Sequence, residues 1–327
     1  MKVIFNRRPR RIVATLVAAV GSLVGSVVGV PAAHAATSCS NYSSATSTCV
    51  NQSISIGGTS YSTDWYFPNT TPTALMLAEH GFSRGCGNLR GTSKAIAEKG
   101  VAVLCINASM TGGNPTLAAT VGDALSARTI TPPSGHALPV NYIVGGHSAG
   151  GHFASAVGKR LADNGYAAFK GAILFDPVAA NSSFTTNLQA ISNGATRPVL
   201  SIAARPATIN SSNNSFGALA SLGAGFVGIQ LLWTGYSGTS GTGASCHVDV
   251  EGENTNWLGT LAAGCSPTTT NTARLRDFAS TWAKDLATGA HTTTHYCTDS
   301  DTLATCGATT YSLVGGTLPL AAVIPNS

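Results

Sequence analysis

Charged side chains are scarce in this sequence: Asp, Glu, Lys and Arg make up only 9% of its 327 residues. Five of the 18 basic residues lie within the first 11 positions, where no acidic residue occurs. The rest of the chain carries 13 basic and 13 acidic groups, so its formal net charge is zero. The overall charge of +5 therefore comes from the N-terminus, and the sequence offers no electropositive surface for a nucleic acid.

Long apolar runs are also rare, and the one run that approaches membrane-spanning length lies near the N-terminus. It extends from Ile12 to Val30 behind a cluster of arginines, contains three glycines and is followed by Pro31. A membrane anchor is the alternative interpretation, but the glycines and the small residues of Ala33–Ala35 favour a cleaved secretory signal. We therefore expect residues 1–35 to be a signal peptide, the mature protein to be secreted, and no anchor to remain.

No Cys-x-x-Cys pair occurs among the eight cysteines, which argues against a structural zinc site. An even number of cysteines in an exported chain indicates disulfides, although eight cysteines allow roughly a hundred pairings. We expect neighbours along the chain to pair. The expected pairs are Cys39 with Cys49, Cys86 with Cys105, Cys246 with Cys265, and Cys297 with Cys306.

Short apolar runs alternate with helical patterns along most of the mature chain. After two alternating segments that predict a hairpin, residues 73–81 and 100–109 are nearly continuous apolar runs, typical of strands buried on both faces. Helical spacing recurs between and after such runs, ending with residues 272–289. The alternation predicts an α/β domain over residues 36–288, with a mostly parallel central sheet flanked by helices on both faces.

Two segments, 179–197 and 207–225, lack a clear period, and we expect them to be loops or a small cap over a site. No insertion is long enough to form a large lid. From residue 289 onward the chain is rich in threonine and carries two cysteines. We expect residues 289–327 to be an extension packed on the domain, and we expect the protein to be a monomer.

The segment Gly146–Gly150 has the pattern G-x-S-x-G with Ser148 at its centre. This match alone is weak in a chain so rich in glycine and serine, and an ordinary turn is the alternative. However, the segment follows the apolar run 140–144 and precedes a helical pattern. A serine at such a junction occupies a strained turn, and a Cβ at either flanking glycine would collide with the neighbouring backbone. The context favours a nucleophile.

A serine nucleophile needs a base and an acid that orients the base. His247 is the only histidine between the helix that follows Ser148 and the last predicted helix, and we expect it to be the base. His152 lies one helical turn beyond Ser148, where we expect it to pack within the fold. The segment of His247 also places Asp249 and Glu251 at alternate positions, which on one face of a strand could bind a metal. No other histidine is within reach, so we expect no metal and no cofactor.

The expected acid is Asp176. The loop after the next predicted strand would be the more usual place, but it contains no Asp or Glu. Asp176 ends an apolar run and is followed by Pro177, which places the carboxylate at the carboxyl edge of the sheet. A carboxylate that only caps a turn is the alternative. Asp123 is expected to lie on a solvated helix face.

Two backbone amides are expected to bind the oxyanion that forms during acyl transfer. One belongs to Ala149, the residue after the nucleophile. The other belongs to Phe82 in the loop after the first buried strand, where Gly81 permits a close approach; Ser83 is the neighbouring possibility.

Four segments carry a family resemblance: EHGFSRG, GGHSAGG, LFDPV and CHVDVEG. Over roughly residues 70–285 the chain resembles the α/β-hydrolase superfamily. Within it, the chain is similar to secreted serine hydrolases related to chlorophyllases, dienelactone hydrolases and cutinase-like polyester hydrolases. The resemblance implies an α/β-hydrolase fold and the same roles for Ser148, Asp176, His247, Phe82 and Ala149.

The chain also departs from these relatives. A signal peptide and eight cysteines are not features of plant chlorophyllases, so the resemblance does not imply a chlorophyll substrate. In cutinase-like polyester hydrolases the acid usually follows the seventh strand and a methionine often follows the nucleophile, and neither holds here.

These features predict a secreted serine hydrolase that cleaves carboxylic esters, either small molecules with short or medium acyl groups or polymers of the polyester type. An amidase or peptidase could use the same three side chains. A non-catalytic binding protein on the same fold is the third possibility, because a fold alone does not define a function.

Overall fold

The computed structural model describes residues 38–223, 225–237, 240–299 and 302–325, and the expected signal peptide lies outside these ranges. The strands are β1 (Ser47–Ile56), β2 (Thr59–Pro68), β3 (Leu75–Glu79), β4 (Ala102–Ile106), β5 (Tyr142–His147), β6 (Phe169–Phe175), β7 (Val199–Ala203), β8 (Gly228–Leu231), β9 (Trp233–Ser237), β10 (Ser240–Ala244) and β11 (Ala321–Val323). The α-helices are α2 (Arg90–Ala97), α3 (Pro115–Ser126), α4 (Ala149–Asp163), α5 (Ser183–Ser192), α6 (Phe216–Ala220), α7 (Trp257–Ala263), α8 (Thr269–Thr288) and α9 (Ala308–Val314). Short 3-10 turns include Cys39–Tyr42, Cys86–Leu89, Thr111–Gly113, Gly252–Asn254, Thr293–His295 and Leu303–Thr305.

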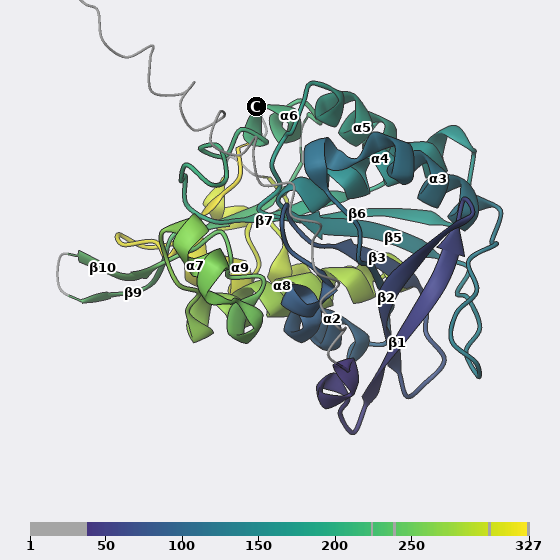
Figure 1. Ribbon diagram of the computed structural model, residues 1–327. Coiled ribbons are helices and arrows are strands. Elements are labelled where there is room, and N and C mark those ends of the chain that lie inside the picture. Colours follow the sequence, from purple (N-terminus) through teal and green to yellow (C-terminus); the bar gives the residue numbers. More distant parts are fainter. Residues whose placement is uncertain (1–37, 224, 238–239, 300–301, 326–327) are drawn as a thin grey trace, which may run out of the picture. The chain divides into compact units, whose positions relative to one another are not determined.

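The main sheet has the strand order β1-β2-β4-β3-β5-β6-β7-β8-β11 (Figure 1). Within this order, the neighbouring strands β4, β3, β5, β6, β7 and β8 all run parallel to one another. Antiparallel pairs close both edges: β1 and β2 form the predicted hairpin at one edge, and β11 pairs with β8 at the other. The prediction of a mostly parallel sheet is confirmed.

Helices cover both faces of this sheet because its central strands are apolar on both sides. On β3, Leu75 and Leu77 belong to one core cluster, whereas Met76 between them belongs to the other. The first cluster includes buried side chains of α3, α4, α5 and α6, and the second includes those of α2, α8 and α9. Figure 1 shows α3, α4 and α5 on one side of the sheet and α2 and α8 on the other. The predicted flanking of both faces is confirmed.

The expectation that residues 179–197 form a loop or a cap is wrong. Most of this segment is α5, which packs against α4. Its buried side chains include Phe184, Leu188 and Ile191, spaced by four and three residues as on one face of a helix. The serine, threonine and asparagine residues of this segment make the helical spacing of its few apolar residues hard to recognise in the sequence. The segment 207–225 is mostly turns, as expected, with the five-residue helix α6 near its end.

The region from residue 226 onward completes the far edge of the main sheet. The apolar run 226–235 contains two strands, β8 and β9, and β9 leaves the main sheet to pair with β10. Near the end of the chain, β11 lies antiparallel to β8, with Ala321 opposite Leu231. The last apolar run of the sequence therefore supplies the outermost strand of the main sheet.

All four expected disulfides are present: Cys39–Cys49, Cys86–Cys105, Cys246–Cys265 and Cys297–Cys306. In the described part of the chain, no helix has the length and apolar character needed to cross a membrane.

Candidate active site

Ser148 lies at the turn between β5 and α4 with a backbone φ of 55° and ψ of −125°. Left-handed φ values are rare for residues other than glycine and mark strain that the surrounding structure must hold. A Cβ on Gly146 would lie 2.4 Å from the carbonyl oxygen of Gly150. A Cβ on Gly150 would lie 2.2 Å from the carbonyl oxygen of His80, at the end of β3. Both glycines are therefore required, and the predicted strand, strained turn and helix are confirmed.

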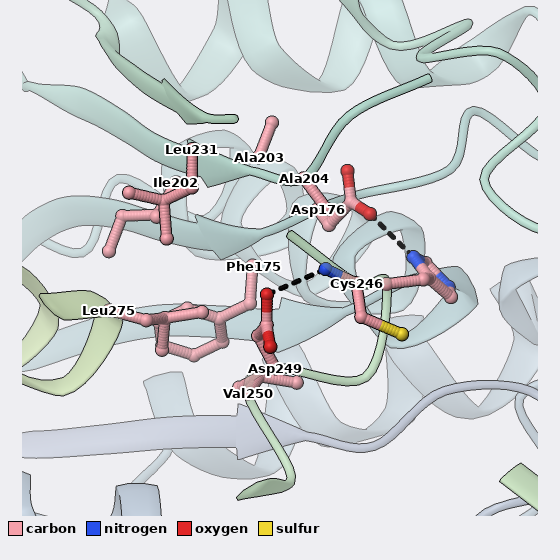
Figure 2. A pocket seen from close by; sticks show the side chains of 11 residues that line it. Phe175, Asp176, Ile202, Ala203, Ala204, Leu231, Cys246, Asp249, Val250 and Leu275 are labelled. Atoms are coloured by element: carbon pink, nitrogen blue, oxygen red, sulfur yellow. Dashed lines mark hydrogen bonds and ion pairs between the residues drawn. The ribbon is translucent and has the colours of Figure 1, made fainter. Parts of the chain in front are cut away.

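The structure brings Asp176 and His247 together. Nδ1 of His247 donates a hydrogen bond to Oδ2 of Asp176 at 2.6 Å, and both side chains are buried. Asp176 follows β6 with a φ of 41°, and its backbone N–H donates to the carbonyl oxygen of Ile202 at 2.8 Å. Figure 2 shows the Asp176 carboxylate, with a dashed line for its hydrogen bond to the imidazole of His247. The strained backbone thus aims the carboxylate at the imidazole from the carboxyl end of the sheet.

Two asparagines that the sequence analysis did not select hold the Asp176 carboxylate. Nδ2 of Asn210 donates to Oδ2 at 3.0 Å, and Nδ2 of Asn213 donates to Oδ1 at 3.2 Å. Both asparagines lie in the loop after β7, which contains no Asp or Glu. Hydrogen bonds to both carboxylate oxygens fix the orientation of the Asp176 side chain. The loop therefore supplies neutral donors to an acid carried by the preceding strand.

The imidazole of His147 links the serine turn to the segment of His247. Its Nε2 lies 2.7 Å from the carbonyl oxygen of His247, so this nitrogen carries the proton and donates it. The two imidazole rings lie 4.4 Å apart. Burial, and next the nearby His247, lower the pKa of His147 well below its ordinary value, which keeps the ring uncharged. Because His147 precedes Ser148, this bond fixes the backbone of His247 beside the serine turn.

The loop after β3 also touches the serine turn. A Cβ on Gly81 would lie 3.1 Å from Cβ of Ser148 and 3.1 Å from Nδ1 of His147, so the close approach predicted for this glycine is present. The next residue, Phe82, exposes 57% of its surface. Among the hydrogen bonds of the described residues, none occupies the amides of Phe82 or Ala149. Both N–H groups are therefore free to donate to an oxyanion.

Two buried ionisable side chains precede this loop. Burial raises the pKa of Glu79 well above its ordinary value, although its carboxyl accepts a bond from the backbone N–H of Ile106 at 3.2 Å. Burial lowers the pKa of His80 to about 4, and Nδ1 of His80 lies 2.9 Å from the carbonyl oxygen of Gly81. Both shifts favour the uncharged form, so neither residue places a charge beside the free amides.

An ion pair joins the loop after β3 to the segment of His247. Nε of Arg84 donates to Oε1 of Glu251 at 2.7 Å, Nη2 of Arg84 contacts Oε2, and Nη1 donates to Oδ1 of Asn256 at 2.9 Å. The glutamate side chain is fully buried. Such a two-pronged pair fixes direction as well as distance. The arginine therefore holds the two loops in one relative position.

The alternative in which His247, Asp249 and Glu251 share one face of a strand is not observed, because residues 247–251 form turns. Their side chains consequently face different partners: His247 faces Asp176, Asp249 caps backbone amides, and Glu251 pairs with Arg84. Within the described ranges, no cluster of three or more His, Cys, Asp and Glu side chains could hold a metal ion.

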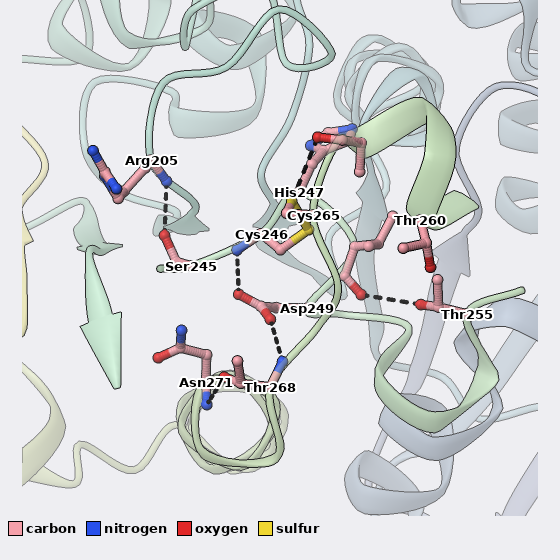
Figure 3. Close-up of a disulfide and its surroundings, with 12 residues drawn as sticks. Arg205, Ser245, Cys246, His247, Asp249, Thr255, Thr260, Cys265, Thr268 and Asn271 are labelled. Carbon is pink, nitrogen blue, oxygen red and sulfur yellow. Dashed lines mark hydrogen bonds between the residues drawn. A yellow bond between two sulfur atoms is a disulfide. The ribbon is translucent and has the colours of Figure 1, made fainter. Parts of the chain in front are cut away.

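The segment of His247 is tied down on its other side by a disulfide and a carboxylate, which Figure 3 shows together. Cys246 is bonded to Cys265. Oδ2 of Asp249 accepts a bond from the N–H of Cys246 at 2.7 Å, and Oδ1 accepts one from the N–H of Thr268 at 3.2 Å. Burial is the main cause that raises the pKa of Asp249 to about 7, and the nearby Asp176 raises it further.

Replacing Asp249 with asparagine is expected to reduce the pH dependence of stability. The ordinary pKa of 3.8 applies to the unfolded chain, so between these two pKa values the folded state keeps a proton that the unfolded state releases. This bound proton stabilises the folded state by at most about 4 kcal/mol. The stabilisation is complete below the ordinary pKa of 3.8 and is lost as the pH rises through about 7. Thermal melts at about pH 5 and pH 8 should therefore show a smaller fall in Tm for Asp249→Asn than for the wild type.

The control for this prediction is Asp123→Asn. Asp123 is exposed and pairs with Arg160, as expected for a solvated helix face, and its hydrogen bond to Arg160 lowers its pKa. Its replacement should leave the fall in Tm between the two pH values nearly unchanged. An equal fall in Tm for the wild type and for Asp249→Asn would contradict the assignment of the titration to Asp249.

His152 packs within the fold as expected. Its Nδ1 accepts a bond from the N–H of Ala180 at 3.0 Å, and its Nε2 lies 3.1 Å from Oγ of Ser183. The ring also lies 5.3 Å from that of Phe184. These contacts join α4 to the start of α5.

A small cavity lies against the Asp176–His247 pair, lined also by Phe175, Ile202 and Leu231 (Figure 2). Its volume is about 10 Å³, close to the lower limit for one water molecule. Most of its lining is apolar. The pair is therefore closely packed on this side, which preserves the strength of its hydrogen bond.

No protein-family model and no curated protein sequence matches the chain. Solved structures do resemble it. A dienelactone hydrolase from Anabaena variabilis is 18% identical, with 53% of this chain and 81% of that chain covered and a TM-score of 0.41. A thermostable esterase from Pseudomonas putida ECU1011 is 13% identical, with coverages of 73% and 83% and a TM-score of 0.49. Carboxyl esterase 2 from Tuber melanosporum is 15% identical, with coverages of 76% and 88% and a TM-score of 0.48.

The chain has the α/β-hydrolase fold. Its eight-strand core order, β1-β2-β4-β3-β5-β6-β7-β8, and the serine on a strained turn between a central parallel strand and its helix are the features of that fold. What the chain does is argued below from its own residues, because one fold hosts many functions.

Proposed function

We propose that this chain is a secreted serine hydrolase that cleaves carboxylic esters, with Ser148 as nucleophile, His247 as base and Asp176 as orienting acid. One observation carries the proposal: a buried imidazole and carboxylate are bonded at 2.6 Å, and the backbone carbonyl of that histidine accepts a bond from His147, the residue before a serine held in a strained strand-to-helix turn. The ψ of −125° also places Ser148 outside the common left-handed conformation, with ψ near about +47°, that single residues in ordinary turns adopt.

In the first half of the proposed reaction, Oγ of Ser148 attacks the ester carbonyl carbon while Nε2 of His247 accepts the hydroxyl proton. The carbonyl oxygen becomes an oxyanion, which the N–H groups of Phe82 and Ala149 stabilise. Asp176 accepts from Nδ1 and so keeps Nε2 available as the base. The intermediate then breaks its bond to the alcohol oxygen, which takes the proton from His247. The products are the free alcohol and an acyl group on Ser148.

In the second half, water replaces the alcohol. His247 accepts a proton from the water as the water oxygen attacks the acyl carbon, and the same two amides stabilise the second oxyanion. Collapse of this intermediate returns the proton to Oγ of Ser148 and releases the carboxylic acid. The cycle uses the side chains of Ser148, His247 and Asp176 and needs no metal or cofactor.

The proposal includes residues 1–35 as a signal peptide, residues 36–288 as the catalytic domain, and residues 289–327 as an extension packed on it. Four disulfides support export, because disulfides persist in oxidising compartments. We further propose a monomer with an open site, acting on esters with short or medium acyl groups or on polyesters.

The first test compares p-nitrophenyl butyrate with the matched p-nitroanilide. The wild-type mature protein should hydrolyse the ester and leave the anilide nearly untouched, since an amide carbonyl is less electrophilic and its amine leaves only after protonation. Initial rates on both substrates provide the measurement. Comparable rates would indicate an amidase or peptidase, and a folded protein inert toward both would indicate a binding protein.

A further inference from the structure

Helix α7 presents large apolar side chains to solvent. The exposed fraction is 71% for Trp257, 52% for Leu258 and 70% for Leu261. Of the residues of this helix, only Gly259 is buried. Exposed apolar side chains that occur singly are ordinary, but three on one short helix form a patch, and such patches mark sites of interaction.

Several contacts place α7 beside the proposed active site. Oδ1 of Asn256, the cap of this helix, accepts a bond from Arg84, two residues after Phe82. A Cβ on Gly259 would lie 2.6 Å from Nη2 of Arg84, so the helix rests on that guanidinium. At its other end, Cys265 is bonded to Cys246, the residue before His247. Figure 3 labels Thr260 of α7 and His247 in one close-up of this disulfide and its surroundings.

Two further exposed apolar side chains come from loops of the same site. Phe82 is 57% exposed in the loop after β3. Ile209 is 36% exposed and precedes Asn210, which donates to Asp176. Five of the nine large apolar side chains that the described residues expose therefore belong to α7 or to these two loops. We call Trp257, Leu258 and Leu261 the apolar face of α7.

Two of the segments around the site contain no charged residue. Neither residues 206–225 nor residues 254–273 contain a single Asp, Glu, Lys or Arg. The first segment holds the carboxylate of Asp176 and the second contains α7. A charged substrate or an anionic membrane would find no complementary group on these segments. The chemistry of the surface matches an uncharged partner.

The apolar side chains of α7 stand out from the protein surface. Trp257, Leu258 and Leu261 each expose more than half of their surface. A side chain on α7 can contact a neighbouring part of a long substrate without that part entering a pocket. An extended chain on a solid surface satisfies this condition better than an acyl tail that needs its own crevice.

We propose that the apolar face of α7 adsorbs the protein to water-insoluble, uncharged aliphatic polyester and so holds ester bonds of the solid near Ser148. This inference rests on the proposed ester hydrolase function and names its substrate class. Adsorption itself needs no catalysis, so it can be measured with Ser148→Ala. Failure of the adsorption proposal is then distinct from failure of the proposed function, which the soluble ester tests.

The experiment measures binding of Ser148→Ala to polycaprolactone particles by depletion from the supernatant. The same protein carrying Trp257→Ser, Leu258→Ser and Leu261→Ser should bind at least ~10-fold more weakly, because three apolar contacts are lost. With Ser148 restored, the triple variant should retain kcat/KM for p-nitrophenyl butyrate within ~2-fold and lose polymer hydrolysis by a factor similar to its loss of binding. A circular dichroism spectrum checks that it is folded.

The matched control is the single variant Val140→Ser, whose adsorption is compared with that of the single variant Leu261→Ser. Val140 is 59% exposed and precedes β5, whereas Ser148 follows the other end of that strand. Only Leu261→Ser should weaken adsorption. Equal adsorption of the triple variant and its parent would overturn the proposal. Two other results would also overturn it. A loss of binding by the triple variant that is confined to a tributyrin emulsion would assign the apolar face of α7 to lipid. A dimer that sedimentation detects and the triple variant abolishes would assign this face to a second copy of the chain.

Discussion

Replacing Ser148 with alanine is expected to lower kcat/KM for p-nitrophenyl butyrate by about 10⁴-fold or more while leaving the protein folded. Alanine removes the only atom that can form the acyl bond, whereas His247, Asp176 and the amides of Phe82 and Ala149 remain. The residual rate should reflect those amides and substrate binding alone. Initial rates at matched enzyme concentration, with circular dichroism of both proteins, provide the measurement.

The control for this prediction is a serine away from the site. Oγ of Ser126 donates to the carbonyl oxygen of Gly122 within α3, and Ser126→Ala should keep activity within ~2-fold. If Ser148→Ala retained a substantial share of the wild-type rate, the nucleophile would have to be another residue. A fluorophosphonate label, which modifies activated serines, should likewise increase the mass of the wild type and of Ser126→Ala but not that of Ser148→Ala.

Replacing Asp176 with asparagine is expected to lower kcat by about 10³-fold to 10⁴-fold. The present carboxylate accepts from His247 through Oδ2 and from two asparagine side chains through both oxygens. An amide has one acceptor oxygen, so its NH₂ group must face Nδ1 of His247 or Nδ2 of an asparagine, all of which are donors. Either orientation disturbs the imidazole tautomer or its position. Turnover of p-nitrophenyl butyrate and Tm should both fall.

Two comparisons make this prediction specific to Asp176. Asp123→Asn changes an exposed carboxylate on α3 and should retain full turnover. Asp249→Asn removes the other carboxylate near His247, and it should affect stability more than turnover because Asp249 bonds to backbone amides. If Asp176→Asn were active and Asp249→Asn inactive, the orienting role would belong to Asp249.

Much of the fold could be predicted from the sequence because its central strands are buried on both faces. Such burial leaves nearly continuous apolar runs, such as residues 73–81, which are easy to recognise. Helix α5 was missed for the opposite reason. Its three buried apolar residues lie among serine, threonine and asparagine, and the buried face becomes clear only once α4 is in place beside it.

The candidate site was partly visible in the sequence. Ser148 and Asp176 carry local signals, a glycine-framed turn and an aspartate that ends an apolar run. Asn210 and Asn213 carry none, because their partner Asp176 lies 34 and 37 residues away. Arg84 and Glu251, separated by 167 residues, are farther apart still. Contacts of this kind depend on which loops the sheet brings to its carboxyl edge.

The four disulfides have a consequence for how the chain becomes oxidised. Each joins one cysteine to the next cysteine along the sequence, over separations of 10, 19, 19 and 9 residues. The proposed secretion would bring the cysteines into an oxidising compartment in chain order. Of the roughly one hundred pairings that eight cysteines allow, this set is the one that arises when the second cysteine of each successive pair reacts with the cysteine before it. Under the proposed secretion the native set therefore forms directly, with little need of an isomerase to reshuffle wrong bonds.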